Sequence, residues 1–203
     1  MRTTDLEISI SINCKLEVAE EGSIAIPLNK LLEITNAMPN SKIDFEVSDI
    51  GKVNIFCDLG QYTIMGQSHE EFPSEQNIEN SQTFIVSSSD LRDIIKSTYY
   101  AASRDDLKPV LGGVLFQINS NGFVSVATDG HRLVKLEKKQ LHSLEYTGAV
   151  VVPIKFLSLL RAQSEEKEEQ ISMLIGKNHV QIQIENVIIT SRIIKDPYPD
   201  YEG

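Results

Sequence analysis

The sequence uses one proline-marked pattern twice, and this internal repeat restricts the fold more than any other feature. Pro27 and Pro73 lie 46 residues apart, and Pro153 and Pro199 are separated by the same 46 residues. The second pair follows the first at an offset of 126 residues. In each pair, the first proline opens an apolar stretch. Because a fixed offset indicates one structural unit used more than once, we expect two related domains.

The two copies differ in completeness. Thr4-Asp5 precedes Pro27 by 23 residues, and Thr128-Asp129 precedes Pro153 by 25 residues. The second copy also has a front half, residues 81–127, for which the first copy has no counterpart. We therefore expect a truncated first domain, a linker and a complete second domain, as a fragment of a larger tandem-domain protein. The predicted boundaries are 1–74 for the back half of the first domain, 75–81 for the linker and 82–203 for the second domain.

Alternation of apolar and polar residues makes β-strands the main predicted element. In residues 5–12 the period of two places the leucine and the isoleucines on one buried face. Asn121-Gly122 and Asp129-Gly130 predict two-residue hairpin turns. The polar stretch 165–170 predicts a loop. Further alternating segments are 43–47, 53–57, 62–64, 114–118, 124–126, 171–175 and 180–184.

Three amphipathic helices interrupt the strands. The first is predicted from Pro27 to about Met38, the second from near Ser88 and Ser89, and the third from Pro153. Each has apolar residues on one stripe, which we expect to face a core. These stripes are Leu28, Leu31, Leu32, Thr35 and Met38; Leu91, Ile94, Ile95, Thr98, Tyr99 and Ala102; and Phe156, Leu157 and Leu160.

The bulk composition excludes several classes of protein. No apolar run approaches the ~20 residues that a membrane span needs, and the first residues carry no signal-peptide pattern. Cys14 and Cys57 are too few for a disulfide framework and predict core thiols of a cytoplasmic protein. Four histidines without a Cys-x-x-Cys pair argue against a zinc site, and no cofactor is expected. Because no nucleophile elbow, phosphate loop or dinucleotide motif occurs, we do not expect an enzyme.

Charge is unevenly distributed along the chain. The formal net charge is −10, which by itself argues against a nucleic-acid partner. The acidic residues, however, gather in loops such as 70–79 and 165–169, whereas several basic residues fall on predicted helices. Arg92 and Lys96 share one helix face at the i, i+4 spacing. An acidic chain can therefore still present a basic surface to phosphates.

Several motifs, in order, resemble the β subunit of bacterial DNA polymerase III, the sliding-clamp family. They are Lys108–Phe116 (KPVLGGVLF), Val126–Leu133 (VATDGHRL) and Tyr198–Tyr201 (YPDY), with Val152–Lys155 at the start of the third helix. Counterparts in the first copy are Thr4–Glu7, Ile26–Lys30 and Phe72-Pro73. The resemblance covers essentially the whole chain, and its strength comes from the order and spacing of the motifs within a duplicated frame.

The resemblance implies an α+β DNA-clamp fold, with antiparallel sheets outside and two helices per complete domain facing a pore. Clamps of this family are head-to-tail dimeric rings with three domains per subunit, so this chain would lack domain three. The implied function is a processivity factor that encircles duplex DNA without reading its sequence. The implied partners are the polymerase III catalytic subunit, the clamp loader and repair proteins, which bind through short peptide motifs. No membrane partner is implied.

Three sites follow from the resemblance. The expected DNA-facing residues are Arg92, Lys96, Arg104, Lys108, Lys155 and Arg161, because a sliding ring needs diffuse positive charge toward phosphates. The expected peptide groove contains Leu111, Thr128, Gly130, His131, Arg132, Leu133 and Pro199, and we expect weak peptide binding because the other wall belongs to domain three. The expected dimer interface contains Ile34, Tyr62 and Ile64.

Plainer interpretations of the same residues stay open. The basic residues could be ordinary solvated charges, the two leucines of the groove could be core residues, and His131 could simply flank a turn. As a whole, the chain could be a tandem β-rich module that binds proteins or peptides and has no DNA role. The clamp interpretation predicts that Arg92, Lys96, Lys155 and Arg161 line one concave surface.

Overall fold

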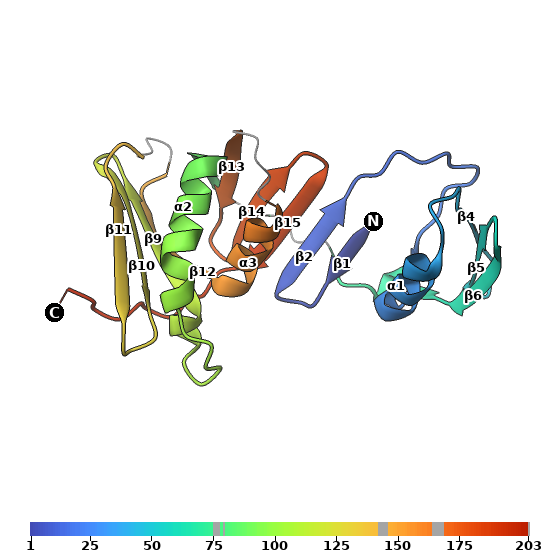
Figure 1. Ribbon diagram of the computed structural model, residues 1–203, viewed down its shortest axis with the longest axis horizontal. Helices are drawn as coiled ribbons and strands as arrows, with labels where there is room; N and C mark the ends of the chain where they lie inside the picture. Colours follow the sequence, from blue (N-terminus) through green and yellow to red (C-terminus); the bar gives the residue numbers. More distant parts are fainter. Residues whose placement is uncertain (75–77, 79, 142–145, 164–168, 203) are drawn as a thin grey trace. The chain divides into compact units, whose positions relative to one another are not determined.

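The computed structural model describes residues 1–74, 78, 80–141, 146–163 and 169–202. Most of the predicted loop at 165–170 lies outside these residues. Two compact units make up the chain. In Figure 1 the second is coloured blue to teal, whereas the first combines the blue N-terminal strands with the green-to-red remainder of the chain. Unit 1 consists of Met1–Cys14 and Gln76–Gly203, and unit 2 consists of Lys15–Glu75. Residues 1–14 thus group with the second repeat, and the predicted boundary after residue 74 stays a prediction.

Unit 1 contains two antiparallel sheets. The first has the order β1-β2-β15-β14-β13-β8, and the second has the order β11-β10-β9-β12. The strands of the first are Arg2–Thr4, Ile8–Ile12, Val187–Arg192, His179–Ile184, Gln170–Ile175 and Gln82–Ser87. Those of the second are Leu133–Lys138, Gly122–Thr128, Gly113–Asn119 and Gly148–Pro153.

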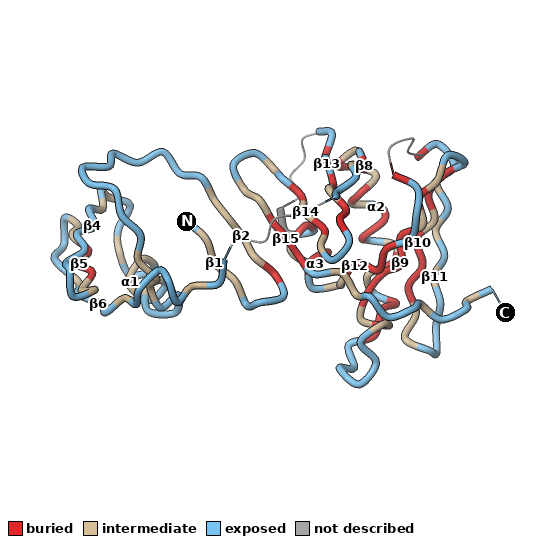
Figure 2. Tube along the Cα trace, turned by 180° about the vertical axis from the view of Figure 1, so that it is seen from behind, coloured by how far each residue is buried: buried red, intermediate tan, exposed pale blue. Residues whose placement is uncertain are grey.

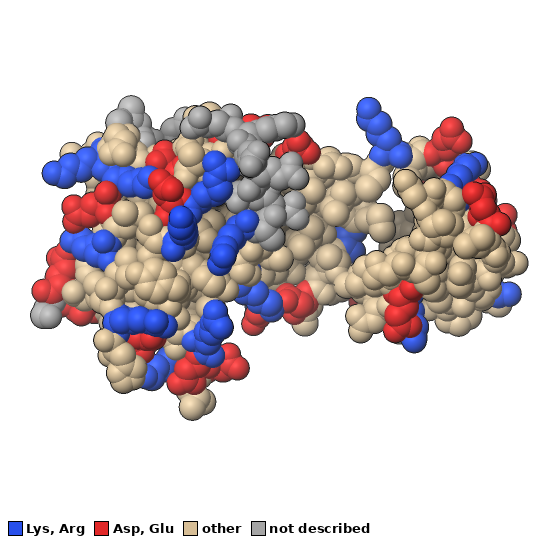
Figure 3. Space-filling view, in the orientation of Figure 1, with Lys and Arg blue, Asp and Glu red and all other residues tan. Residues whose placement is uncertain are grey.

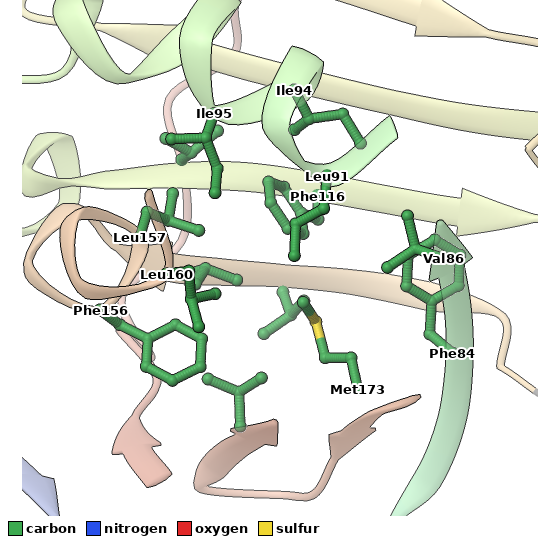
Figure 4. Close-up of a cluster of buried hydrophobic side chains, with 14 of the residues drawn as sticks. Phe84, Val86, Leu91, Ile94, Ile95, Phe116, Phe156, Leu157, Leu160 and Met173 are labelled. Carbon is green, nitrogen blue, oxygen red and sulfur yellow. The ribbon is translucent and has the colours of Figure 1, made fainter. Parts of the chain in front are cut away.

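Two helices complete unit 1 and supply much of its core. Helix α2 (Ser88–Thr98) begins where the Ser87 hydroxyl accepts the N–H of Asp90 at 3.0 Å. Helix α3 (Ile154–Gln163) follows the end of β12. Figure 4 shows side chains of both helices meeting those of β8, β9 and β13. The predicted inner residues Leu91, Ile94, Ile95, Thr98, Ala102, Phe156, Leu157 and Leu160 are all buried, whereas Tyr99 is half-buried.

Unit 2 has a much smaller core. It contains α1 (Leu28–Ala37), a sheet of order β4-β5-β6, the short pair β3 and β7, and the 3-10 turn η1. Only Val53 and Ile55 of β5 are buried among its described residues, and Figure 2 shows most of this unit as exposed or intermediate. The remaining bounds are Ile24–Ala25 (β3), Asp44–Val47 (β4), Lys52–Cys57 (β5), Gly60–Met65 (β6), Gln67–Ser68 (β7) and His69–Glu71 (η1).

The predicted inner face of the first helix is wrong, because no residue of α1 is buried. Leu28 and Leu32 are 49% and 46% exposed. The predicted core thiols are also wrong, since Cys14 is exposed and Cys57 is half-buried. An apolar stripe becomes a core only where other elements cover it, and within unit 2 few elements do so.

Two turn predictions also need correction. Leu6 does not continue the strand alternation, because it lies in the turn between β1 and β2 with a φ of 76° and 62% exposure. The hairpin predicted at Asn121-Gly122 forms, but Asn119 pairs with Gly122, so its two-residue loop is Ser120-Asn121. The hairpin at Asp129-Gly130 also forms, but Thr128 pairs with Leu133, so its loop has four residues rather than two.

Candidate functional site

Most of the predicted groove residues lie in the tightly bonded turn between β10 and β11 or at the strand ends that flank it. One carboxylate oxygen of Asp129 accepts the backbone N–H groups of His131 at 2.9 Å and Arg132 at 3.0 Å. The Thr128 hydroxyl donates to the carbonyl of Arg132 at 2.7 Å and accepts the N–H of Gly130 at 3.0 Å. Gly130 has a φ of 91°, a region that glycine adopts without strain.

These bonds explain the electrostatics of the turn. Hydrogen bonds from the backbone of His131 and Arg132 lower the pKa of Asp129 to about 2. The Arg132 guanidinium adds an ion pair with the other carboxylate oxygen at 2.9 Å. Asp129 therefore stays ionised near neutral pH and fixes the loop from which His131 and Arg132 project.

An open cleft of about 870 Å³ lies beside this turn. Its charged residues include four cations and two carboxylates, so it is positively charged overall. It brings together three predicted DNA-facing residues and two predicted groove residues. The lining residues are Tyr99, Tyr100, Ala102, Ser103, Arg104, Asp105, Lys108, Asp129, His131, Arg132 and Arg161.

Two tyrosines of this cleft were missed by the sequence interpretation as site residues. Tyr99 and Tyr100 belong to the 3-10 turn η2 (Tyr99–Ala101), directly after α2. The Arg132 guanidinium lies 5.9 Å from the centre of the Tyr100 ring, within reach of a cation–π attraction. Tyr100 is 55% exposed. Paired aromatic residues just past a helix end were the available signal, because exposed aromatic side chains often mark binding surfaces.

The remaining predicted DNA-facing residues do not join the cleft. Lys155 of α3 forms ion pairs with Asp5 and with Glu7, the latter at 3.1 Å. Hydrogen bonds to these two carboxylates raise the pKa of Lys155. Arg92 is half-buried and Lys96 is exposed, both on α2. Lys and Arg side chains lie over this part of unit 1 in Figure 3, with acidic side chains among them. Of the four helix residues expected on one concave surface, only Arg161 lines the cleft.

The other predicted groove residues lie in different surroundings. Leu111, in the 3-10 turn η3 (Pro109–Gly112), is 9% exposed and counts as core, whereas Leu133 is 46% exposed. Pro199 lines a second open cleft, of about 710 Å³, between the C-terminal segment and β9 and β12. Next to it, burial raises the pKa of Tyr198 to about 12, and the Tyr198 hydroxyl lies by the backbone of Thr128. The C-terminal segment therefore approaches the Thr128 turn through Tyr198.

The predicted interface residues belong to unit 2. In the β5–β6 ladder Tyr62 lies opposite Ile55, and Ile64 lies opposite Val53. Tyr62, Ile64 and Ile34 of α1 are all half-buried. Strand β6 is an outer strand of its sheet, so one of its backbone edges has no partner strand among the described residues.

Neither a metal site nor a membrane span emerges from the described part of the chain. No group of three or more histidine, cysteine, aspartate or glutamate side chains is placed to hold a metal ion there. Within the same residues, every helix is too short or too polar to cross a bilayer.

Comparison with known proteins decides the family. The family described as DNA polymerase III beta subunit, central domain, matches residues 85–200, and its N-terminal domain matches residues 1–78. The chain belongs to the DNA polymerase III beta subunit family. This finding favours the clamp interpretation over a module without a DNA role.

Individual relatives agree with the family. The beta sliding clamp of Pseudomonas putida is 30% identical over 201 residues, which are 98% of this chain and 54% of that protein. The crystal structure of the DNA polymerase III subunit beta from Pseudomonas aeruginosa matches with a TM-score of 0.89 and 29% identity, over 99% of this chain and 56% of that one. A sliding clamp of P. aeruginosa bound to griselimycin matches with a TM-score of 0.86 and 30% identity, over 99% of this chain and 55% of that one. The chain thus spans about half the length of these relatives, and the α+β clamp fold is confirmed.

Proposed function

We propose that this chain forms part of a sliding clamp of DNA replication, a non-catalytic cytoplasmic ring that encircles duplex DNA and tethers a polymerase. Membership of the DNA polymerase III beta subunit family carries this proposal. In such a ring the chain contributes to a homodimer and presents a groove to the polymerase catalytic subunit, the clamp loader and repair proteins. Its domains are the back half of domain one, residues 1–74, a linker at 75–81, and domain two, residues 82–203.

DNA contact is assigned first to Arg104, Lys108 and Arg161. Their common position around one cleft supports this assignment, because clustered cations raise the local potential for phosphates. Arg92 and Lys96 contribute more diffuse charge from α2. Lys155 contributes least, since the carboxylates of Asp5 and Glu7 offset its charge.

Peptide binding is assigned to the surface around the Thr128 turn. The members are Leu111, Thr128, Gly130, His131, Arg132, Leu133 and Pro199. The fixed loop and the exposed Leu133 support this role, because a partner peptide needs an apolar contact and a few oriented polar groups. The griselimycin-bound clamp of P. aeruginosa shows that a related protein binds that compound.

The subunit interface is assigned to Ile34, Tyr62 and Ile64 of unit 2. One edge of β6 has no partner strand among the described residues, and this supports the assignment, because such an edge pairs readily with another strand. This interface and the DNA surface lie in different units, so each can be altered without the other.

The proposal is tested with a chimeric clamp in which this chain replaces the matching half of the P. putida protein. After loading, the chimera is expected to stay on closed circular duplex DNA and to leave after linearisation. The triple variant Arg104→Gln, Lys108→Gln, Arg161→Gln is expected to lose retention as salt rises, with the slope of log affinity on log salt smaller by about 1 per lost phosphate contact.

Lys195→Gln is the matched control, because Lys195 is an exposed cation that lines the second cleft and not the first. Sedimentation first verifies that the chimera assembles as a dimer. An assembled chimera that leaves circular DNA as quickly as linear DNA refutes the proposed function.

A further inference from the structure

Three cations surround a histidine at one end of the six-stranded sheet of unit 1. His179 is the first residue of β14, and Arg192, the last residue of β15, lies directly opposite it in the ladder. Opposite residues of an antiparallel pair project from the same face of a sheet, so the two side chains are neighbours. Lys195 follows Arg192 by three residues, and Lys177 lies in the turn between β13 and β14. These four residues are called the His179 cluster below.

Two segments of the chain meet at this cluster. The N–H of Ile193 donates to the carbonyl of Asn178 at 3.0 Å, so the chain after Arg192 runs beside the turn that carries Lys177. Lys177 and Lys195 line the same open cleft, of about 710 Å³. The fold therefore holds like charges together, although such charges repel one another.

The carboxylate on the neighbouring strand does not neutralise the cluster. Within the described residues, Lys177, Arg192 and Lys195 form no ion pair. The backbone of Glu7 does reach Arg192, because its carbonyl accepts the N–H of Arg192 at 3.0 Å. The carboxylate of Glu7, however, binds the ammonium group of Lys155 at 3.1 Å.

Three further carboxylates line the cleft, and two of them are engaged elsewhere. Glu202 is paired with Lys135 at 3.3 Å, and Asp200 accepts the N–H of Glu202 at 3.1 Å. Asp196 follows Lys195 in the sequence and is exposed. Three cations beside this carboxylate leave the cluster with a positive charge.

The imidazole of His179 gives a second, independent observation. Its Nε2 atom is buried and has no hydrogen-bond partner among the described residues. Burial lowers the pKa of His179, and the positive charges of Arg192 and Lys195 lower it further. A buried polar atom without a partner is costly, and in folded proteins such an atom often marks the place of an ion or a water. Next to several cations, the ion that fits is an anion.

The cluster lies on the face of the sheet that points away from α2 and α3. Val180 and Ile182 belong to the core that these helices help to form. Because successive residues of a strand project to opposite faces, His179 and Gln181 point to the other side. Gln181 donates to the hydroxyl of Thr190 at 2.9 Å, so the next pair along this face is uncharged. The cluster is therefore separate from the cleft to which we assign DNA contact.

We propose that the His179 cluster binds the phosphate group of a small molecule, either free phosphate or a phosphomonoester. The planar guanidinium of Arg192 can donate two parallel hydrogen bonds to phosphate oxygens, and the two ammonium groups act as point charges. A protonated imidazole donates from both nitrogens, so the Nε2 of His179 also gains an acceptor. This site goes beyond the proposed function, which assigns no role to these residues.

An NMR titration of the His179 imidazole tests the site, at an ionic strength held constant with sodium chloride. Inorganic phosphate is expected to raise the pKa of His179, because a bound anion favours the protonated form. Arg192→Gln, Lys195→Gln removes two of the cations. Without phosphate, this double variant is expected to raise the pKa of His179, since the repulsion is gone. Its affinity for phosphate is expected to fall by at least about tenfold.

Lys96→Gln, Lys139→Gln is the matched control, because it removes two exposed lysines that line neither cleft. This control is expected to keep the phosphate response of the parent chain. The proposal is overturned if phosphate leaves the pKa of His179 unchanged in the parent chain. It is also overturned if the two double variants respond alike, or if removing Arg192 and Lys195 does not move the pKa of His179 before phosphate is added.

A competition experiment distinguishes the two possible sources of the phosphate. A nucleoside monophosphate and a short single-stranded oligonucleotide are compared at equal phosphate concentration. The monophosphate is expected to displace inorganic phosphate from the His179 cluster at least as well as the oligonucleotide does. Stronger displacement by the oligonucleotide overturns the assignment to a small molecule. The measurement involves neither ring assembly nor duplex DNA, so its failure and the failure of the proposed function are separate results.

Discussion

Helices α1 and α3 carry the same pattern in two different settings. Leu31 and Leu157 stand 126 residues apart, as do Ile34 and Leu160. In α3, Leu157 and Leu160 are 0% and 1% exposed, whereas no residue of α1 is buried. The difference comes from the surroundings, because α3 packs within the core that α2 and two sheets also form (Figure 4). An apolar stripe thus specifies a helix face, but only other elements turn that face into a core.

The largest expected effect is a difference in the free energy of unfolding between matched variants of α3 and α1. Leu157→Ala leaves a cavity in a core that is closed on all sides, so it is expected to lower the free energy of unfolding by about 2–5 kcal/mol. Leu31→Ala removes a side chain that is only half-buried, and its cost is expected to stay below about 1 kcal/mol. Urea unfolding followed by circular dichroism measures both. Equal losses in the two variants would mean that α1 is buried in solution.

Much of the fold could be predicted from local pattern. Alternation located the strands, and prolines and serines located the helix starts, because these signals depend on nearby residues alone. Burial of α1 and of the cysteines was predicted wrongly, since burial depends on which distant segments cover a face. The four-residue loop at Asp129 was also missed, because the Asp-Gly pair marks a turn without fixing its length.

The candidate site, too, could be predicted only where the signal is local in the sequence. The motif around the Thr128 turn identified a loop whose side chains do converge on one cleft. The pairing of Lys155 with Asp5 and Glu7 was invisible, because Glu7 and Lys155 are 148 residues apart and no local signal links them. That contact changes the role expected for Lys155, which illustrates how a sequence pattern can locate a cation without telling whether its charge is available.

The N-termini of α2 and α1 also differ, and we expect this difference to have a smaller effect on the free energy of unfolding. Ser87 caps α2 through its hydroxyl, whereas α1 follows Pro27 and has no side-chain cap. Ser87→Ala is therefore expected to lower the free energy of unfolding of unit 1 by about 1 kcal/mol. Ser97→Ala, near the end of the same helix, is the control and is expected to change it by less than about 0.5 kcal/mol. If both variants unfold at the same urea concentration, the hydroxyl of Ser87 does not stabilise the helix start.

The smallest expected effect concerns the acid titration of two turns, that of Asp5 between β1 and β2 and that of Asp129 between β10 and β11. Partial burial tends to raise the pKa of Asp5, but hydrogen bonds from Lys155 and from the backbone of Ile8 and Glu7 outweigh it and lower the pKa. In Asp129 the backbone bonds dominate and bring the pKa to about 2. Lys155→Gln is therefore expected to return the pKa of Asp5 toward its ordinary value, whereas Arg132→Gln is expected to leave most of the Asp129 shift in place.

Carboxyl chemical shifts in a ¹³C NMR titration report both values. Because both folded-state pKa values lie below the unfolded value of about 3.9, each carboxylate stabilises the fold above that pH. The stabilisation is lost as the pH falls through the folded pKa. Acid therefore weakens both turns, and the ionised form of Asp129 persists to about pH 2. If Arg132→Gln moves Asp129 as far as Lys155→Gln moves Asp5, then side-chain cations control both turns. If Lys155→Gln moves the pKa of Asp5 further than Arg132→Gln moves that of Asp129, then the carboxylate of the first turn depends on a cation of α3, and that of the second turn depends on its own backbone.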